Sequence, residues 1–228
     1  PAVRQSALIA GVGMGPGCGV CRRATTRSFQ TIGRLSYRRC RRCMAITLDA
    51  AHWLSPGLER DIYHRHQNDP GDPGYRDFLG RLVTPLCRIL PAHQQGLDFG
   101  CGPGPALSAM MTDAGHDFVN YDLFFAPDPA VLRRHYDVVT ASEVIEHLRR
   151  PAAVFDQFDA LLKPGGWLGL MTRFQTDDAR FANWHYRRDP THVVFYRAET
   201  LRWLARDRGW LCVIPAANIA LMKKPGGG

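Results

Sequence analysis

From residue 96 onward, short apolar runs alternate with helix-length segments, and this alternation restricts the fold more than any other feature. We predict strands at residues 96–99, 117–121, 137–141, 167–172, 211–215 and 218–222, and helices at 106–114, 151–162 and 198–208. Strands separated by helices predict an α/β fold with a mainly parallel sheet covered on both faces. The last two strands are too close for a parallel crossover, so we expect an antiparallel hairpin.

The turn after the first predicted strand, residues 97–104 (LDFGCGPG), is rich in glycine and leads into a helix. Glycines in this context let the backbone approach a nucleotide-type ligand without a Cβ in the way. Pro103 and Pro105 have no N–H to give a phosphate, which argues against a dinucleotide, and no Lys–Ser/Thr pair follows, which excludes a P-loop. The next strand ends before Asp122, where a carboxylate would bind the two hydroxyls of a ribose. The pattern favours an adenosine cofactor.

These residues, together with 137–147 (DVVTASEVIEH) and 161–166 (LLKPGG), resemble the class I S-adenosylmethionine-dependent methyltransferases. Within that family the resemblance, over about 96–223, is strongest to the quinone-biosynthesis methylases. It implies a Rossmann-like, doubly wound sheet and an enzyme that transfers a methyl group from S-adenosylmethionine. Only 14 residues (123–136) separate Asp122 from Asp137, too few for the usual helix, strand and helix, so we expect the third strand to be missing. Phe124 and Phe125 would then help to wall the adenine pocket.

By the same resemblance, the cofactor-binding residues are Asp98, Gly100, Cys101, Gly102, Gly104, Asp122, Ala141, Ser142 and Glu143. An oxygen or nitrogen acceptor must lose a proton, and the catalytic candidates for taking it are Glu143, His147 and His192. The segment 181–193 follows a strand at the sheet edge where ligands bind. We expect it to contact the acceptor through His185, Tyr186, Asp189 and His192. The alternative is that residues 189–192 are a capped turn in which His192 has a structural role.

Two C-x-x-C pairs near the start of the chain, Cys18 with Cys21 and Cys40 with Cys43, are separated by 18 residues (22–39). This spacing predicts a tetrahedral structural zinc site, with unmetallated or redox-active dithiols as the alternative. We divide the chain into a disordered leader (1–17), a four-cysteine zinc-binding module (18–50), a helical lid or linker (51–95) and a methyltransferase domain (96–228). A turn rich in Pro and Gly at 69–74 divides the linker into two helices.

The formal net charge of +8 is concentrated near the N-terminus, where eight arginines stand between residues 22 and 42 without any acidic residue. Such a surface is either simply solvated or a binding site for RNA or for an acidic protein. We favour a small-molecule or carrier-bound acceptor. The alternatives are an RNA-binding or RNA-modifying protein and a catalytically inactive binding protein with the same fold. No apolar run is long enough to span a bilayer, which predicts a cytoplasmic protein without a membrane span.

Overall fold

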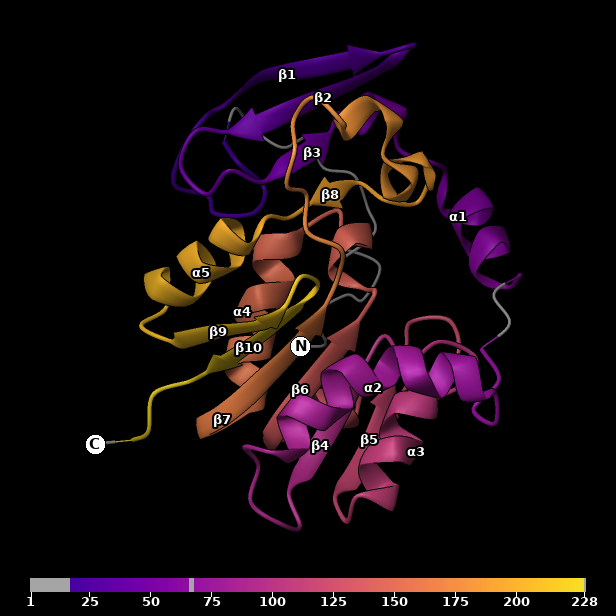
Figure 1. The fold of residues 1–228 in the computed structure, drawn as a ribbon, viewed down its shortest axis with the longest axis vertical. Helices are drawn as coiled ribbons and strands as arrows, with labels where there is room; N and C mark the ends of the chain where they lie inside the picture. The colour runs from indigo at the N-terminus through magenta and orange to yellow at the C-terminus, as the bar shows by residue number, and fades with distance from the viewer. Residues whose placement is uncertain (1–16, 66–67, 228) are drawn as a thin grey trace.

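The main sheet of the protein has six strands in the order β5-β4-β6-β7-β10-β9 (Figure 1). The computed structural model describes residues 17–65 and 68–227, so the predicted leader, apart from Gly17, lies outside the described residues. β4 pairs in parallel with β5 and β6, and β6 with β7, whereas β10 is antiparallel to β7 and β9. The strands are β4 (Gln95–Phe99), β5 (Asp117–Tyr121), β6 (Tyr136–Ser142), β7 (Leu162–Met171), β9 (Leu211–Ala216) and β10 (Ile219–Lys223). The predicted α/β class and C-terminal hairpin are confirmed.

β5 is an edge strand, and no strand lies in the described segment 122–135 that follows it. The chain instead closes an isolated bridge between Asp122 and Ala126 and makes a short 3-10 turn at Val131–Arg133 before it enters β6. The prediction that the third strand is missing is therefore confirmed. The physical reason is length, because so short a connection holds one loop and one turn but not a helix, a strand and a second helix.

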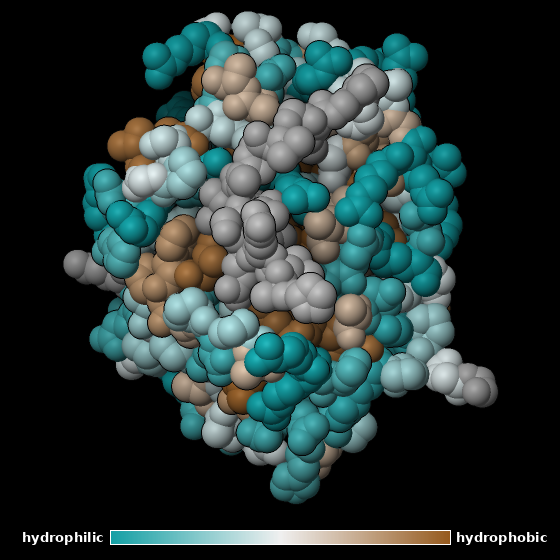
Figure 2. Space-filling view, turned by 180° about the vertical axis from the view of Figure 1, so that it is seen from behind, coloured by the Kyte–Doolittle hydropathy of each residue, from teal (hydrophilic) through white to brown (hydrophobic). Residues whose placement is uncertain are grey.

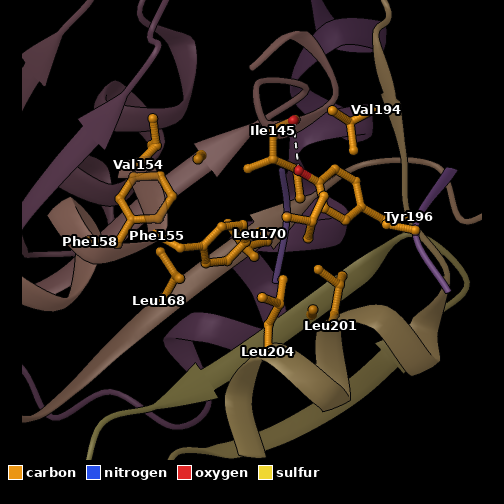
Figure 3. Close-up of a cluster of buried hydrophobic side chains, with 14 of the residues drawn as sticks. Ile145, Val154, Phe155, Phe158, Leu168, Leu170, Val194, Tyr196, Leu201 and Leu204 are labelled. Atoms are coloured by element: carbon orange, nitrogen blue, oxygen red, sulfur yellow. Dashed lines mark hydrogen bonds between the residues drawn. The ribbon is translucent and has the colours of Figure 1, made fainter. Parts of the chain in front are cut away.

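Helices cover both faces of this sheet because successive residues of a buried strand point to opposite sides. Val138 packs with α2 and α3, and its neighbour Val139 belongs to the cluster that contains α4 and α5. Figure 3 shows the second cluster, in which Phe155 and Phe158 of α4 lie near Leu168 and Leu170 of β7. The helices are α1 (Pro56–Tyr63), α2 (Pro73–Cys87), α3 (Ala106–Asp113), α4 (Pro151–Leu161) and α5 (Ala198–Asp207).

The turn at residues 69–74 separates α1 from α2, as the sequence predicts. The Asp72 carboxylate accepts the N–H of Tyr75 at 2.6 Å, which caps α2, and Pro73 occupies the first position of the helix. Proline is tolerated there because a first-turn N–H has no partner within the helix. The linker therefore consists of two helices joined by a polar turn.

A second, four-stranded sheet lies above the first in Figure 1 and has the order β1-β2-β3-β8. Its strands are β1 (Thr26–Ile32), β2 (Leu35–Cys40), β3 (Ile46–Leu48) and β8 (Val194–Phe195). β3 belongs to the predicted zinc-binding module, whereas β8 comes from the predicted methyltransferase domain, and the two are antiparallel. β8 is not predictable from the sequence, because two residues are too few to show an alternation of apolar and polar side chains. One hydrophobic cluster contains buried residues of both sheets.

The surface seen from behind is mostly hydrophilic, with hydrophobic side chains in separate patches (Figure 2). Within residues 17–65 and 68–227, no helix combines the length and the apolar character that crossing a membrane would need. This finding agrees with the absence of a long apolar run in the sequence.

Candidate functional site

A cavity of about 590 Å³ lies at the carboxyl ends of β4, β5, β6 and β7. Ligands bind at this edge in open α/β sheets because the loops there are free to vary. Its wall includes six predicted cofactor-binding residues, Gly100, Cys101, Gly102, Asp122, Ser142 and Glu143. It also includes the predicted acceptor or acid–base residues His147, His185, Tyr186, Asp189 and His192. The fold therefore brings these segments, which are far apart in the sequence, around one space.

The glycine turn at the end of β4 depends on the missing side chains of its glycines. Gly100 and Gly102 have φ angles of +79° and +66°, in the left-handed region that favours glycine. A Cβ on Gly100 would lie 2.5 Å from the Val144 side chain, and a Cβ on Gly104 would lie 1.6 Å from the Asn68 carbonyl oxygen. Gly104 thus allows the α1–α2 linker to approach and is not part of the cavity wall given by the described residues.

Asp122 is oriented by backbone N–H groups on both sides. Its Oδ1 accepts from Phe124 N at 2.8 Å and Phe125 N at 3.1 Å, and its Oδ2 accepts from Gly102 N at 3.1 Å. A carboxylate has about four acceptor positions, and contacts between described residues fill three of them, so one on Oδ2 remains for a ligand hydroxyl. Phe124 and Phe125 line the cavity beside it, and their ring centroids lie 5.7 Å from Tyr63 and 5.1 Å from His64, respectively. This aromatic wall comes from the short segment after β5 that contains no third strand.

Asp98 and Ala141, two other predicted cofactor residues, lie behind the wall rather than in it. Asp98 is 3% exposed, and its Oδ1 accepts a hydrogen bond from the Thr140 hydroxyl at 2.8 Å. Burial raises the pKa of Asp98 to about 7, although the Thr140 hydrogen bond opposes this shift. Ala141 is fully buried in β6. Both residues support the glycine turn and the strand end from within the sheet.

Glu143, which is half-buried, and Glu146, which is fully buried, form a carboxyl pair around the Tyr186 hydroxyl. That hydroxyl lies 3.0 Å from Glu143 Oε2, 3.0 Å from Thr172 Oγ1 and within hydrogen-bond distance of Glu146 Oε1. It has one proton to donate, so it serves only one carboxylate at a time, and the other is satisfied when it is protonated. Burial raises the pKa of Glu143 to about 6 and that of Glu146 well above its usual range. Burial thus favours the protonated form of Glu146 more strongly than that of Glu143.

Glu143 is the member of this pair that faces the cavity. It follows β6 with a φ of +52°, which is unusual for a glutamate, and its N–H donates to the Met171 carbonyl at 2.8 Å. Its Oε1 is buried and has no hydrogen-bond partner among the described residues. Such an oxygen is costly unless a ligand or water pairs with it. The geometry suits a base that contacts a bound acceptor.

His147 and His192 lie side by side next to the carboxyl pair, with ring centroids 4.6 Å apart. His147 Nδ1 lies 3.2 Å from the Thr191 carbonyl, and His192 Nδ1 lies 2.7 Å from the Tyr186 carbonyl. Asp189 accepts the N–H of Thr191 at 2.9 Å, so residues 189–192 do form the capped turn considered as an alternative. His192 is 7% exposed but still contributes to the cavity wall, so its place in this turn does not remove it from the site.

Several cavity residues were missed by the sequence analysis. They include Tyr75 and Phe78, one turn apart on α2, and the cations Arg149, Arg150 and Arg173. Arg173 comes two residues after β7, so the rule that ligands bind at carboxyl ends of strands would have found it. Arg149 pairs with Glu59 at 2.7 Å. Tyr75, Phe78 and Glu59 of the linker carry no motif, and only the fold shows that they reach the site.

A protein-family model described as "Methyltransferase domain" matches residues 63–213. The chain belongs to this methyltransferase-domain family. The ubiquinone biosynthesis O-methyltransferase of Paraburkholderia phytofirmans is 31% identical over 97 residues, 41% of this chain and 40% of that protein. The one of Bordetella avium is 33% identical over 148 residues, 54% of this chain and 56% of that protein. The chain thus spans about half the length of the curated relatives it matches.

The fold of this methyltransferase-family chain is also found in a solved structure from Burkholderia thailandensis. It is the 1,6-didemethyltoxoflavin-N1-methyltransferase, determined with 1,6-didemethyltoxoflavin and S-adenosylhomocysteine bound. The two structures have a TM-score of 0.55 and 16% identity, over 87% of this chain and 99% of the other. At this identity the likeness shows the shared fold and nothing more specific.

The four cysteines lie outside the segment that the family model matches, but they converge in space as the spacing predicts. The Sγ atoms of Cys18 and Cys43 are 3.7 Å apart and those of Cys21 and Cys40 are 3.6 Å apart. Zinc–sulfur bonds of about 2.3 Å in a tetrahedron place the sulfurs about 3.8 Å apart. All four side chains are buried, and all four Sγ atoms lie within 4.8 Å of one another. This donor set fits one zinc ion with no open coordination position.

Half of the arginines between residues 22 and 42 contact other parts of the chain. Arg22 pairs with Asp156 at 2.5 Å, Arg23 with Asp207 at 3.5 Å, and the buried Arg39 with Asp178. Arg42 lies over the ring of Trp203. The remaining four, Arg27, Arg34, Arg38 and Arg41, are exposed. The excess positive charge therefore serves in part to attach this segment to the methyltransferase fold.

Asp98→Asn should flatten the dependence of stability on pH. A folded-state pKa near 7, above the usual 3.8, means that the folded protein binds the Asp98 proton more tightly than the unfolded chain does. The contribution of Asp98 to the free energy of unfolding is therefore highest at low pH and falls as the pH rises from about 4 to about 7. Above pH 7 we expect the variant to be more stable than wild type, on the order of 2 kcal/mol, in urea unfolding. The exposed Asp77→Asn is the control, and a variant with unchanged slope would contradict this account.

Proposed function

We propose that this protein transfers a methyl group from S-adenosylmethionine to a hydroxyl oxygen of a small or carrier-bound acceptor. The observation that carries the proposal is a single cavity that joins the glycine turn and Asp122 to the Glu143–Tyr186–Glu146 cluster. Family membership supports the reaction class. The name of the curated relatives, O-methyltransferase, supports oxygen as the receiving atom.

The residues at the β4–β5 end of the cavity are suited to hold the cofactor. The backbone of Gly100–Gly102 would lie along its amino acid part, the remaining acceptor position of Asp122 would take a ribose hydroxyl, and Phe124 and Phe125 would flank the adenine. When bound, S-adenosylmethionine supplies an activated methyl group on a positively charged sulfur. The protein mainly has to align the acceptor with it and exclude water.

The residues at the β6–β7 end would bind and deprotonate the acceptor. Glu143, ionised at neutral pH, takes the proton of the acceptor hydroxyl as the oxygen–methyl bond forms and the sulfur–methyl bond breaks. The sulfur of a bound donor would keep the electron pair of the broken sulfur–methyl bond and leave as an uncharged thioether, so that charge and atoms balance. Tyr186 orients Glu143, and burial, which raises the pKa of Glu146, disfavours a second negative charge beside it. His147, His185, Asp189 and His192, which line the same cavity, would contact the acceptor beside the carboxyl pair.

The four cysteines, in this proposal, hold one structural zinc ion. Four buried thiolates without a cation would repel one another, and the sulfur spacing matches a closed tetrahedral site. Binding energy from zinc would also compensate for the small hydrophobic core of a short segment. Zinc here has no catalytic role, because it offers no open position.

Asp122→Asn should weaken cofactor binding. Loss of the charged acceptor removes a hydrogen bond to a ribose hydroxyl, so we expect the dissociation constant for S-adenosylmethionine in calorimetry to rise by at least about tenfold. Asp128→Asn is a matched control, since Asp128 caps its own turn in the same loop but does not line the cavity. Saturable binding of NAD by wild type, with no binding of S-adenosylmethionine, would refute the proposed function.

Glu143→Gln should lower the turnover number by about a hundredfold or more, because the general base is lost. In wild type, kcat/KM should fall as the pH drops through about 6, where the Glu143 carboxylate becomes protonated. Methyl transfer to catechol, a simple hydroxyl acceptor, measures both effects. Glu199→Gln, an exposed position on α5, is the control. A Glu143→Gln enzyme with wild-type rate would remove Glu143 as the base while leaving the cofactor site intact.

Purified protein should contain about one zinc per chain by elemental analysis. Cys40→Ser should lower both the zinc content and the melting temperature, because three ligands bind the ion less tightly than four. Cys212→Ser, far from the cluster in sequence and half-buried in β9, should retain zinc. A fully folded wild-type protein without metal would show that the thiols have another role.

A further inference from the structure

The segment that carries the predicted acceptor residues, 172–193, has little regular structure of its own. We refer to it as the acceptor loop. Between β7 and β8 it contains only two short 3-10 turns, at Phe181–Asn183 and His185–Arg188. His185, Tyr186, Asp189 and His192 of this loop all line the cavity. A loop of this kind loses considerable conformational entropy when it is held in one shape, so other parts of the protein must stabilise it.

The first attachment of the acceptor loop is an ion-pair cluster around Asp178. Arg39 of β2, which is 3% exposed, donates from Nη1 and Nη2 to the two carboxylate oxygens of Asp178. Arg197, which precedes α5, donates to Asp178 Oδ1 and, through Nε at 2.6 Å, to Gln175 Oε1. The Arg39 guanidinium also lies 4.0 Å from the ring centroid of Phe29 on β1. Paired arginines hold the start of the loop, and Arg39 is the one contributed by the N-terminal sheet.

The second attachment is aromatic and lies further along the loop. The Arg187 Nη1 donates to the Tyr37 hydroxyl of β2 at 3.1 Å. The Tyr37 ring is edge-on to Phe181 and to Phe195, with centroid distances of 5.0 and 6.0 Å. Tyr37 and Phe181 are both buried. These contacts hold the segment on either side of Tyr186, whose hydroxyl bridges the carboxyl pair.

The third attachment is backbone pairing directly after His192. Leu48 N donates to the Val193 carbonyl at 2.8 Å, and β3 then continues antiparallel to β8. On the other side, Val193 N donates to the Glu146 carbonyl at 2.9 Å. The Tyr196 hydroxyl donates to the Ile145 carbonyl at 3.0 Å, as the dashed line in Figure 3 shows. The end of the loop is therefore fixed between β3 and the segment that carries the carboxyl pair.

Residues 17–50, which supply strands β1, β2 and β3, hold the acceptor loop from outside the site, because none of them contributes to the cavity wall. Outside the loop, residues 17–50 contact α4 and α5 through Ala152 N to the Gly19 carbonyl at 3.1 Å and the Arg22–Asp156 and Arg23–Asp207 pairs. They also pair with β8 through β3, and Trp53 Nε1 donates to the Leu48 carbonyl at 3.2 Å. β4 and β5, which lead into the glycine turn and Asp122, lie away from β1, β2 and β3 (Figure 1). The module therefore reaches the predicted acceptor residues chiefly through its contacts with the loop, whereas its link toward the cofactor end is the chain that continues through residues 51–55 into α1.

We propose that the four-cysteine module, residues 18–50, positions the acceptor loop through Arg39, Tyr37 and the β3–β8 pair, and that binding of the acceptor depends on this support. Arg39 is a positioning residue that acts through Asp178. The statement that this loop receives a methyl acceptor rests on the proposed function, whereas the anchoring of the loop by Arg39 does not.

The test compares Arg39→Gln with Arg38→Gln, its neighbour on β2. Arg38 is exposed and bonds only within the sheet, to Thr26, among the contacts of the described residues. Hydrogen exchange followed by mass spectrometry reports how firmly peptides 179–193 and 96–122 are held. We expect Arg39→Gln to speed exchange in 179–193 by at least about tenfold and to leave 96–122 unchanged. Arg38→Gln should leave both unchanged, and both variants should keep wild-type zinc content.

Enzyme assays with catechol separate positioning from general loss of structure. Arg39→Gln should raise the KM for catechol by about tenfold or more, with the dissociation constant for S-adenosylmethionine within twofold of wild type. Asp178→Asn should have at least this effect, because it also loses the Arg197 pair, and the double variant should be no worse than Asp178→Asn alone, because Arg39 acts through Asp178. Rapid exchange caused equally by Arg38→Gln, or additive effects in the double variant, would overturn the role of Arg39.

The result for the loop and the result for the function can be told apart. If wild type transfers no methyl group to any acceptor and binds no S-adenosylmethionine, the proposed function fails, while the exchange experiment still decides whether Arg39 anchors the loop. If peptides 179–193 exchange at the same rate in Arg39→Gln and wild type, the anchoring inference fails whatever the activity.

Discussion

The parallel pairing of β4 with β5 and β6 is the interaction on which the rest of the site depends. Parallel strands end at the same edge, so the glycine turn, Asp122 and Glu143 come to one cavity although they are spread over more than forty residues of sequence. The turn is joined directly to the neighbouring strand, because Gly100 N donates to the Tyr121 carbonyl at 2.7 Å. A change in this register would separate the cofactor end from the acceptor end.

Two unusual features of this fold, an absent strand and a loop supported by a second sheet, lie at that edge. The chain omits the strand that would follow β5 and uses Phe124 and Phe125, packed near α1, as a wall in its place. At the opposite end, an N-terminal sheet supports a long irregular loop that the main sheet cannot hold alone. Arginines of the N-terminal sheet that seem from the sequence to offer a basic surface are partly engaged in this support.

The predicted strands and helices agree with the structure because each one carries a strong local signal. Val138 and Val139 are both apolar since a strand of this sheet is covered on both faces, and Asp72–Pro73 marks the start of α2 by capping chemistry. β8 could not be predicted, because its two residues gain their stability from β3, which lies about 150 residues earlier in the chain. Arg149 was missed for a similar reason, since an isolated arginine carries no spacing that marks a site.

The sequence by itself determined the fold class, the missing strand, the glycine turn with its acid and the spacing of the four cysteines, since each follows from residue type and chain length over a short distance. Only the tertiary structure decided which groups meet. It placed the Tyr186 hydroxyl between Glu143 and Glu146, moved Asp98 behind the cavity wall, and joined the cysteine module to the acceptor loop through Arg39. These contacts depend on packing between distant segments, and the energy of a buried carboxyl or guanidinium is set by neighbours that local sequence does not specify.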